Sequence, residues 1–439
     1  MKWFFIVLFI LVAPSISFSQ TDPSLLKLKS FAIKYFPRGY DSSLNYINLQ
    51  PGGNLHYLAP LYQFFKQENK FKSILGNDYY AQLSEAVSFT EDYHSALEIE
   101  EQGYDTVDEE SEKKIKKTVE ELKGVQHVDA RRYISFLAKD FKVIMLNEAH
   151  AKTLHRAFAI SLLEELYKKG FHYLAMEMLN NYPNHSLNRL TINTGYYTAE
   201  PVAGELVRHA LELGFTLVSY EDTAALTGNH TARERDSVQA ENIYSIIKKD
   251  PAAKIFVFAG YGHIAEKTTD PDFIPMAMKF KKISGIDPLT IDQTDMTEGS
   301  NFGYANALYK AYTQKYFFTN PSVAVMNNVP VHITNNDVYD ISVIHPPTIY
   351  RDGRPDWLSL YGLRQPVYVN PNIKDVFLVQ AYYQKEADQY GPGQIVPADQ
   401  SYIPTNKGNY LLYLRKGKYI IIYRSFGYHL IGKLKIDVE

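Results

Sequence analysis

The pattern of apolar and polar positions changes twice along the chain, and each change predicts a different kind of structure. From Asp22 to about Lys123, apolar residues recur mostly at helical steps, which predicts a helical cap or lid. Its charged stretch Asp108–Lys123 is expected to be a solvated helix. After Phe141, short apolar runs alternate with helical stretches, and after about Tyr316 short segments alternate with Gly, Pro and Asn turns.

The central region is predicted to be a series of parallel strands connected by helices. Helical stretches near Leu154–Lys169 and Val202–Leu213 are each followed by a glycine, which is a common helix stop. The order strand, helix, glycine, strand is typical of βαβ units, and nearly continuous apolar strands indicate a sheet covered on both faces. The expected strands are Val143–Leu146, Tyr173–Met176, Thr216–Tyr220, Lys254–Ala259 and Pro288–Asp292.

The last region predicts a small β-rich module. We therefore expect four parts: a signal peptide over 1–19, a helical cap region over 20–126, an α/β domain over 127–315 and a β-rich C-terminal module over 316–439. The strands expected in the last part are Val323–Met326, Val338–Val343, Val376–Val379, Tyr410–Leu414 and Tyr419–Tyr423.

The first residues form a targeting signal. Lys2 precedes an apolar run, Trp3–Val12, and the small residues Ser17 and Ser19 predict cleavage before Gln20. The run is too short to span a bilayer, so no permanent membrane span is expected after cleavage. The absence of cysteine excludes disulfides and thiol chemistry, and in an exported chain it favours a bacterial periplasm or the extracellular medium over an animal secretory route.

Charge adds one exclusion. The chain has 46 Lys and Arg against 49 Asp and Glu residues, so no basic excess is present to neutralise nucleic-acid phosphates. We therefore expect no nucleic-acid partner.

Acidic residues and histidines follow the expected central strands at the points where those strands end. Because ligands bind outside the carboxyl ends of parallel strands, we expect these side chains to form one site. Turn formation alone does not require so many of them. The set consists of Glu148, His150, Glu177, Glu221, Asp222 and His263.

Two kinds of chemistry fit this set. A histidine with a neighbouring carboxylate can deprotonate a water for attack on a carbonyl carbon. Alternatively, Glu148, His150, Glu177 and His263 are the ligands of a divalent metal ion that keeps an open position for water. In an extended chain, alternate residues share a face, so Glu148 and His150 are expected on the same side.

Three flanking residues are further candidates. Arg235 opens the helix before the fourth strand, where it could stabilise an oxyanion or clamp a carboxylate. His155, at the start of the helix after the first strand, is expected either to turn back toward the rim and bind a cofactor or to lie exposed. Tyr261 is the candidate cofactor ligand among the rim tyrosines.

Five short motifs occur in an order that resembles one known superfamily over about Phe141–Ile264. This superfamily joins erythromycin esterase-like hydrolases, ChaN-like haem/iron-binding proteins and TraB/TIKI-type proteases. The resemblance implies a Rossmann-like, mainly parallel α/β core with its site at the strand ends. The motifs are Leu146-Asn147-Glu148-Ala149-His150 with His155, Ala175-Met176-Glu177, Tyr220-Glu221-Asp222, Arg235-Asp236, and Ala259-Gly260-Tyr261-Gly262-His263.

The resemblance also implies roles for single residues. Glu148 and His150 match the first Glu/His motif, and its spacing is that of the ChaN and TIKI branches. Glu177 matches the second acidic position, Arg235 the helix arginine and His263 the last histidine. Esterase-like members are thought to activate water without a metal, TraB/TIKI-type members are metal-dependent and ChaN-like members bind haem.

The leading hypothesis is an exported hydrolase that cleaves an ester, lactone or amide bond in a small-molecule or peptide substrate. His150 or His263 would activate the water, with Glu148 and Glu177 orienting the base or binding a cation. Arg235 would stabilise the developing anion. The alternatives are a ChaN-like haem/iron-binding protein, with His150, His263 or Tyr261 as ligand, and an interaction module with a degenerate site. A divalent metal ion and haem are therefore the candidate cofactors.

Overall fold

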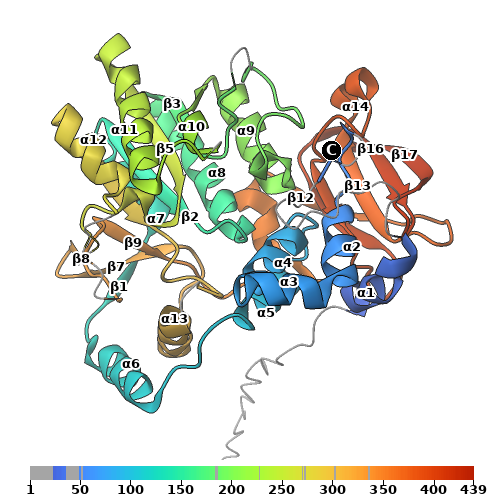
Figure 1. The fold of residues 1–439 in the computed structure, drawn as a ribbon, viewed down its shortest axis with the longest axis horizontal. Coiled ribbons are helices and arrows are strands. Elements are labelled where there is room, and N and C mark those ends of the chain that lie inside the picture. Colours follow the sequence, from blue (N-terminus) through green and yellow to red (C-terminus); the bar gives the residue numbers. More distant parts are fainter. Residues whose placement is uncertain are drawn as a thin grey trace, which may run out of the picture.

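The computed structural model describes residues 23–35, 49–50, 53–182, 186–226, 228–268, 270, 273–300, 303–334 and 337–439. The predicted signal peptide lies outside these residues. Figure 1 shows the central sheet with its helices on one side, the C-terminal strands on the other, and the first helices below and between them.

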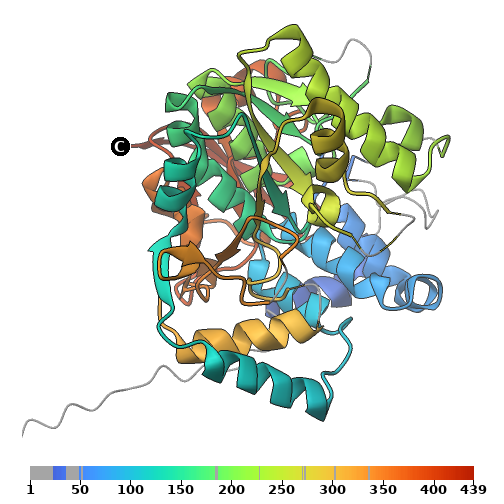
Figure 2. The same cartoon turned by 90° about the vertical axis from the view of Figure 1, so that its left-hand side faces the viewer.

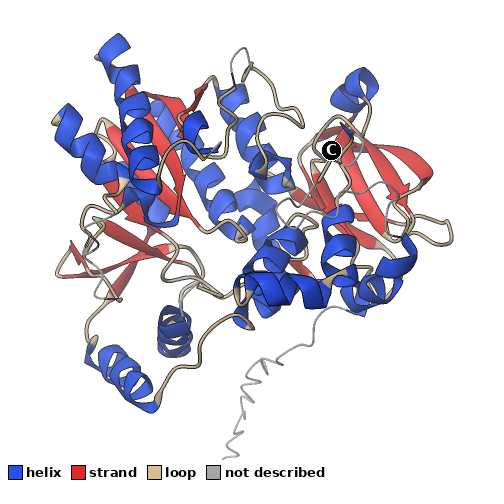
Figure 3. Cartoon of the chain, viewed as in Figure 1, coloured by secondary structure: helices blue, strands red, loops and turns tan. Residues whose placement is uncertain are grey.

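The largest sheet, in the left half of Figure 3, is mixed and mostly parallel and is called the central sheet below; together with its helices it confirms the predicted α/β fold class. Its strand order is β1-β7-β9-β6-β2-β5-β3-β4, and the short β8 pairs with β7. The six strands from β9 to β4 run parallel, whereas β7 pairs antiparallel with both β9 and β1. The strands are β1 Gln126–Asp129, β2 Val143–Glu148, β3 Phe171–Met176, β4 Thr216–Ser219, β5 Lys254–Gly260, β6 Leu289–Asp292, β7 Ser322–Met326, β8 Val329–Pro330 and β9 Ile341–Ile344.

Helices cover both faces of this sheet because successive residues of each strand point to opposite sides. Ile144 and Leu146 of β2 pack in one apolar cluster with helices α8 and α9. Val143 and Met145 pack in another with α11 and α12. The helices are α7 Ala130–Leu137, α8 Thr153–Lys168, α9 Pro201–Leu213, α10 Thr223–Leu226, α11 Ala232–Lys249 and α12 Met276–Ser284.

Two strands expected in the C-terminal module belong to the central sheet instead. β7 pairs antiparallel with β1 and β9, and β9 pairs parallel with β6. The β-rich module therefore begins later than residue 316, after β9. The short alternating pattern predicted strands correctly in this region, but it carries no information about which sheet they join.

The N-terminal helices lie against two different parts of the molecule. α1 and α2 lie beside the C-terminal strands (Figure 1), where Phe31 is in ring contact with Phe426. Phe89, just after α4, instead contacts the rings of Tyr196 and Tyr197 beside the central sheet. The bounds are α1 Pro23–Tyr35, α2 Ala59–Lys66, α3 Glu68–Leu75, α4 Asp78–Ser88 and α5 Tyr93–Glu101.

The charged stretch forms helix α6, Glu109–Glu121, which is mostly exposed as expected. Asp108 caps it by accepting a hydrogen bond from the N–H of Ser111 at 2.7 Å. Its two buried residues, Ile115 and Val119, pack against α13, Gly303–Lys315, and the two helices lie side by side in Figure 2. None of the described helices combines the length and apolar character that crossing a membrane requires.

The C-terminal module contains short antiparallel sheets, β10-β11, β12-β15 and β14-β13-β16-β17. A buried carboxylate fixes it to the central domain. Glu205 of α9 forms ion pairs with Arg364 at 3.2 Å and with Arg415 at 3.1 Å, and it accepts a hydrogen bond from Tyr383. The elements are β10 Tyr350–Arg351, β11 Arg354–Pro355, β12 Gln365–Val369, β13 Leu378–Tyr383, α14 Gln384–Tyr390, β14 Asp399–Ser401, β15 Tyr410–Leu414, β16 Gly417–Arg424 and β17 Leu430–Val438.

Candidate functional site

The predicted meeting of strand ends occurs. In the pairing of β2 with β5, Glu148 lies opposite Gly260, and β3 ends beside β5, one residue before Glu177. A cavity of about 280 Å³ opens at this edge of the sheet. It is lined by Glu148, His150, Glu177, Met178, Leu179, Asn180, Asn181, Tyr196, Tyr197, Glu221, Arg235, Phe258, Ala259, Gly260 and His263.

One corner of the cavity is a histidine–carboxylate pair. Nδ1 of His150 lies 3.4 Å from Oε1 of Glu148. Oε2 of Glu148 accepts a hydrogen bond from Nε of Arg156 at 2.8 Å, and the fully buried Arg156 also pairs with Glu200 at 3.1 Å. Glu200 in turn caps α9 by accepting from the N–H groups of Val202 and Ala203. This chain of contacts fixes the position of Glu148, which can orient the imidazole.

The imidazole of His150 is enclosed by aromatic rings and by one glycine. It stacks on Tyr197 with ring centroids 4.5 Å apart, and Tyr261 meets it edge-on at 4.9 Å. A Cβ at Gly260 would lie 2.7 Å from Cε1 of His150, so only glycine allows this approach. Among the described residues, Nε2 of His150 has no hydrogen-bond partner.

The pKa of His150 is raised above its ordinary value of 6.5. Burial alone would lower this pKa, but the hydrogen bond and charge of Glu148 outweigh it, with contributions from Glu177 and Glu85. His150 is therefore a stronger base than an exposed histidine.

The opposite corner is organised by Arg235. Its guanidinium pairs with Glu177 and Glu221 and donates from Nη1 to Nε2 of His263 at 3.0 Å. The other oxygen of Glu177 accepts from the N–H of Gly260 at 2.5 Å. Burial would raise the pKa of Glu177, but His263, Arg235 and His150 lower it below its ordinary value, so this carboxylate is ionised.

His263 has partners at both ring nitrogens. Nδ1 lies 3.0 Å from Asp236, which also accepts from the N–H of Met276. Because Nη1 of Arg235 can only donate, Nε2 of His263 accepts and Nδ1 carries the proton. Burial lowers the pKa of His263, but Asp236 and Glu177 raise it above 6.5 overall. Protonation of His263 therefore breaks its hydrogen bond with Arg235.

Three predicted site residues lie outside the cavity lining. Asp222 is not among the lining residues and pairs with His230 at 2.6 Å. Tyr261 lies at the rim, where its hydroxyl accepts from the N–H of His150 at 3.3 Å. His155 is completely buried, neither exposed nor directed to the rim, because Nδ1 accepts the N–H of Ala149 at 3.0 Å. Burial lowers the pKa of His155 far below its ordinary value, so it is a neutral structural residue.

The donor set does not fit a divalent metal ion as the residues are placed. No group of three or more His, Asp or Glu side chains within the described ranges is arranged to hold one. The guanidinium of Arg235 lies among Glu177, Glu221 and His263, where it already supplies the positive charge. The predicted ligand set Glu148, His150, Glu177 and His263 is therefore split between two corners.

Haem fits no better. The cavity lies at the lower end of the range for small-molecule sites, and three carboxylates line it. An apolar macrocycle in this space would bury Glu148, Glu177 and Glu221 against its rings, at a cost in desolvation.

Sequence reasoning missed the residues that support His150. Arg156 lies within the apolar stretch Leu154–Leu163. An arginine in a helix that is otherwise apolar is rarely buried without a charged partner, and this could have indicated its role. Glu85 of α4 contributes to the electrostatics of His150, and burial raises the pKa of Glu85. No local pattern connects α4, or the cavity wall at Tyr196 and Tyr197, with strand β2.

No known protein-family model matches the chain, and no curated protein is significantly similar to it. The type III effector HopBA1 is a similar solved structure, with 11% identity and a TM-score of 0.30 over 51% of this chain and 96% of that chain. A structure described as bacterial protein toxins has 13% identity and a TM-score of 0.29, over 62% of this chain and 54% of its own. Similarity at this level carries no inference about activity.

Proposed function

We propose that the chain is an exported hydrolase in which His150 activates a water molecule to cleave an ester, lactone or amide bond. The observation that carries the proposal is the state of His150. One ring nitrogen is oriented by Glu148, and the other is unpartnered among the described residues of a small cavity. The charged N-terminal segment with its apolar run supports the export.

The chemical step uses this orientation. Nε2 of His150 removes a proton from water while the water oxygen bonds to the substrate carbonyl carbon. Glu148 stabilises the imidazolium that forms, and its own charge is held by Arg156. Collapse of the tetrahedral intermediate breaks the bond to the leaving alcohol or amine, which takes the proton back from His150.

Arg235 is the group best suited to stabilise the developing oxyanion. A guanidinium has five N–H donors, and four of them contact Glu177, Glu221 and His263. One N–H on Nη1 has no partner among the residues that the structure describes. In a site shielded from water, one such donor contributes about 2.7–4 kcal/mol to the stability of the transition state.

The cavity supports a small substrate, or one small group of a larger one. Tyr196 and Tyr197 offer aromatic surface. The amides of Asn180 and Asn181 also line the cavity, where each is held by a hydrogen bond that it donates to a backbone carbonyl. The lining carries three carboxylates against one guanidinium, so a neutral or cationic substrate suits it better than a polyanion.

A panel of esters, lactones and amides tests the proposal with matched histidine variants. His150→Ala is expected to lower kcat/KM for any responsive substrate by about 10²-fold or more. His230→Ala is the control, because His230 also pairs with a carboxylate but lies outside the cavity lining. Full activity of a folded His150→Ala variant would refute the assignment.

A further inference from the structure

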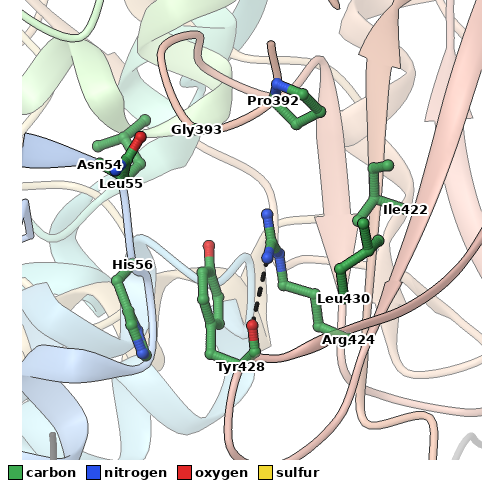
Figure 4. Close-up of a pocket in the computed structure, with 9 residues that line it drawn as sticks. All are labelled: Asn54, Leu55, His56, Pro392, Gly393, Ile422, Arg424, Tyr428 and Leu430. Atoms are coloured by element: carbon green, nitrogen blue, oxygen red, sulfur yellow. Dashed lines mark hydrogen bonds between the residues drawn. The ribbon is translucent and has the colours of Figure 1, made fainter.

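A second cavity, of about 310 Å³, lies where the N-terminal segment meets the C-terminal module (Figure 4). It shares no lining residue with the candidate site. Three parts of the chain form it: a segment before α2, the loop after α14, and the edge between β16 and β17. The lining residues are Asn54, Leu55, His56, Pro392, Gly393, Ile422, Arg424, Tyr428 and Leu430.

The polar centre of this cavity is Arg424, whose guanidinium has no carboxylate partner among the residues that the structure describes. Nε donates to Gln380 at 2.5 Å and Nη1 to the carbonyl of Tyr428 at 3.2 Å, and the hydroxyl of Tyr382 is a further neutral hydrogen-bonding neighbour. Other arginines of the same module differ, because Arg354 pairs with Asp399 at 2.7 Å and Arg415 with Glu205 at 3.1 Å. Within the described part of the chain, the cavity therefore contains a positive charge that no carboxylate compensates.

The guanidinium is held in place rather than mobile. It lies over the ring of Tyr428, 4.2 Å from the ring centroid, and the other face of that ring stacks on His56 at 3.8 Å (Figure 4). Tyr428 adopts a left-handed backbone conformation with φ of 62°, which is strained for a residue with a side chain. Strain of this kind persists where the surrounding structure fixes it, and it is frequent in ligand sites.

The opposite wall is also pinned. The N–H of Leu55 donates to the carbonyl of Gly393 at 3.1 Å, and Gln394 donates to the carbonyl of Gly53 at 2.9 Å. These contacts tie the N-terminal segment to the loop after α14, so the cavity exists before any ligand binds.

The lining limits the charge and shape of a ligand. Burial lowers the pKa of His56 to about 3, so His56 stays neutral and Arg424 supplies the single positive charge of the lining. A guanidinium fork matches the two oxygens of a carboxylate. Leu55, Ile422 and Leu430 supply apolar surface beside it.

We propose that this cavity binds a small organic monocarboxylate, whose carboxylate pairs with Arg424 and whose apolar body packs against Leu55, Ile422 and Leu430. A neutral molecule of the same shape lacks the ion pair. Inorganic phosphate lacks the apolar body. Tight binding therefore requires a carboxylate and an apolar body in the same molecule, which neither of these two compounds has.

Calorimetric titration of the full chain with hexanoate, hexanamide and inorganic phosphate tests this proposal. Hexanoate is expected to bind at least tenfold more tightly than either of the others. Equal binding of hexanamide, or binding of phosphate in preference to hexanoate, would overturn it. Failure to detect hexanoate binding at millimolar concentration would overturn it as well.

Matched variants locate the binding. Arg424→Gln is expected to weaken hexanoate binding at least tenfold. Arg189→Gln, the control, also removes a guanidinium that lies over a tyrosine ring, Tyr390 at 4.3 Å, but at an exposed position, and it leaves binding unchanged. Unchanged affinity in Arg424→Gln would refute the proposal.

A second pair of variants keeps the test decisive if Arg424→Gln fails to fold. Leu430→Glu places a carboxylate at the cavity edge, at a position that is 59% exposed and tolerant of charge. It is expected to abolish hexanoate binding. Leu434→Glu, on the same strand at 43% exposure and outside the lining, is expected to bind as the parent chain does. Equal affinity of these two variants would contradict the proposal.

Discussion

The candidate site contains two histidines with similar partners and different states. His150 is oriented by Glu148 and keeps one nitrogen unpartnered among the described residues, whereas His263 is held at both nitrogens by Asp236 and Arg235. Both lie at strand ends of the same sheet, and both have a raised pKa. A histidine oriented by a carboxylate is therefore a candidate base only where the other imidazole nitrogen is available to a substrate or to water.

The largest expected effect comes from the buried arginine behind the His150 corner. Arg156→Met leaves the buried carboxylates of Glu148 and Glu200 without their guanidinium partner, so the free energy of unfolding should fall by about 3–5 kcal/mol. Urea denaturation followed by circular dichroism measures this. Arg235→Met is the counterpart at the other corner, where the arginine side chain is 26% exposed, and the loss should be smaller. Equal decreases in the free energy of unfolding would show that the two arginines contribute equally to stability despite their different burial.

Substitution of the carboxylate partner should lower kcat more for His150 than for His263. Glu148→Gln removes the charge that orients His150 and stabilises its imidazolium, so kcat should fall by about 10²-fold. Asp236→Asn changes the partner of His263, which transfers no proton in the proposed step, and kcat should fall by about tenfold or less. Steady-state kinetics on one responsive ester compares them. The reverse ranking would assign the base to His263.

Two glycines near the site allow a steric test. Gly260→Ala forces a Cβ against His150, which should lower stability by about 1–3 kcal/mol and also lower kcat. At Gly262, an added Cβ meets nothing within 4 Å, so Gly262→Ala should change neither quantity. Thermal unfolding and kinetics measured on both variants check this. An unperturbed Gly260→Ala variant would mean that His150 does not need its close approach to the strand.

The smallest effect is expected from pH. A base must be neutral, so kcat/KM should rise as pH increases above 6.5 through the raised pKa of His150. The stability that comes from its charged form has the opposite dependence: it is fully present below pH 6.5 and is lost as pH rises through the folded-state pKa. Glu148→Gln should shift the activity profile to lower pH. A pH profile of kcat/KM that does not shift in this variant would mean that the titrating group is not His150.

Much of the central fold could be predicted from sequence because its signals are local. Strands β2, β3 and β5 are apolar runs bounded by turns, and the predicted starts or ends lie within two residues of those observed. The position of β7 and β9 in the central sheet could not be predicted, because strand pairing depends on contacts between distant segments. A strand pattern specifies the pleat and its faces, but not the neighbouring strand.

The same division applies to the site. Glu148, Glu177 and His263 could be predicted because parallel strands end at one edge, so their position along the chain implies their place in space. The burial of His155 depends on the helix angle and on His345, which lies far away in sequence. The role of Arg156 depends on Glu200, which follows β3 in the sequence, whereas Arg156 precedes that strand. Contacts of this kind between distant side chains leave no periodic pattern in the sequence from which they could be predicted.

The attachment of Glu205 to Arg364 and Arg415 has a consequence for dissecting the molecule. A fragment that ends after β9 would lose both arginines together with Tyr383, so Glu205 would be left without these partners on the surface of α9. Such a fragment would expose the face of α9 that the C-terminal strands cover. The two halves are therefore best regarded as one cooperative folding unit, and loss of activity in a truncated chain would not by itself place a catalytic group in the missing half.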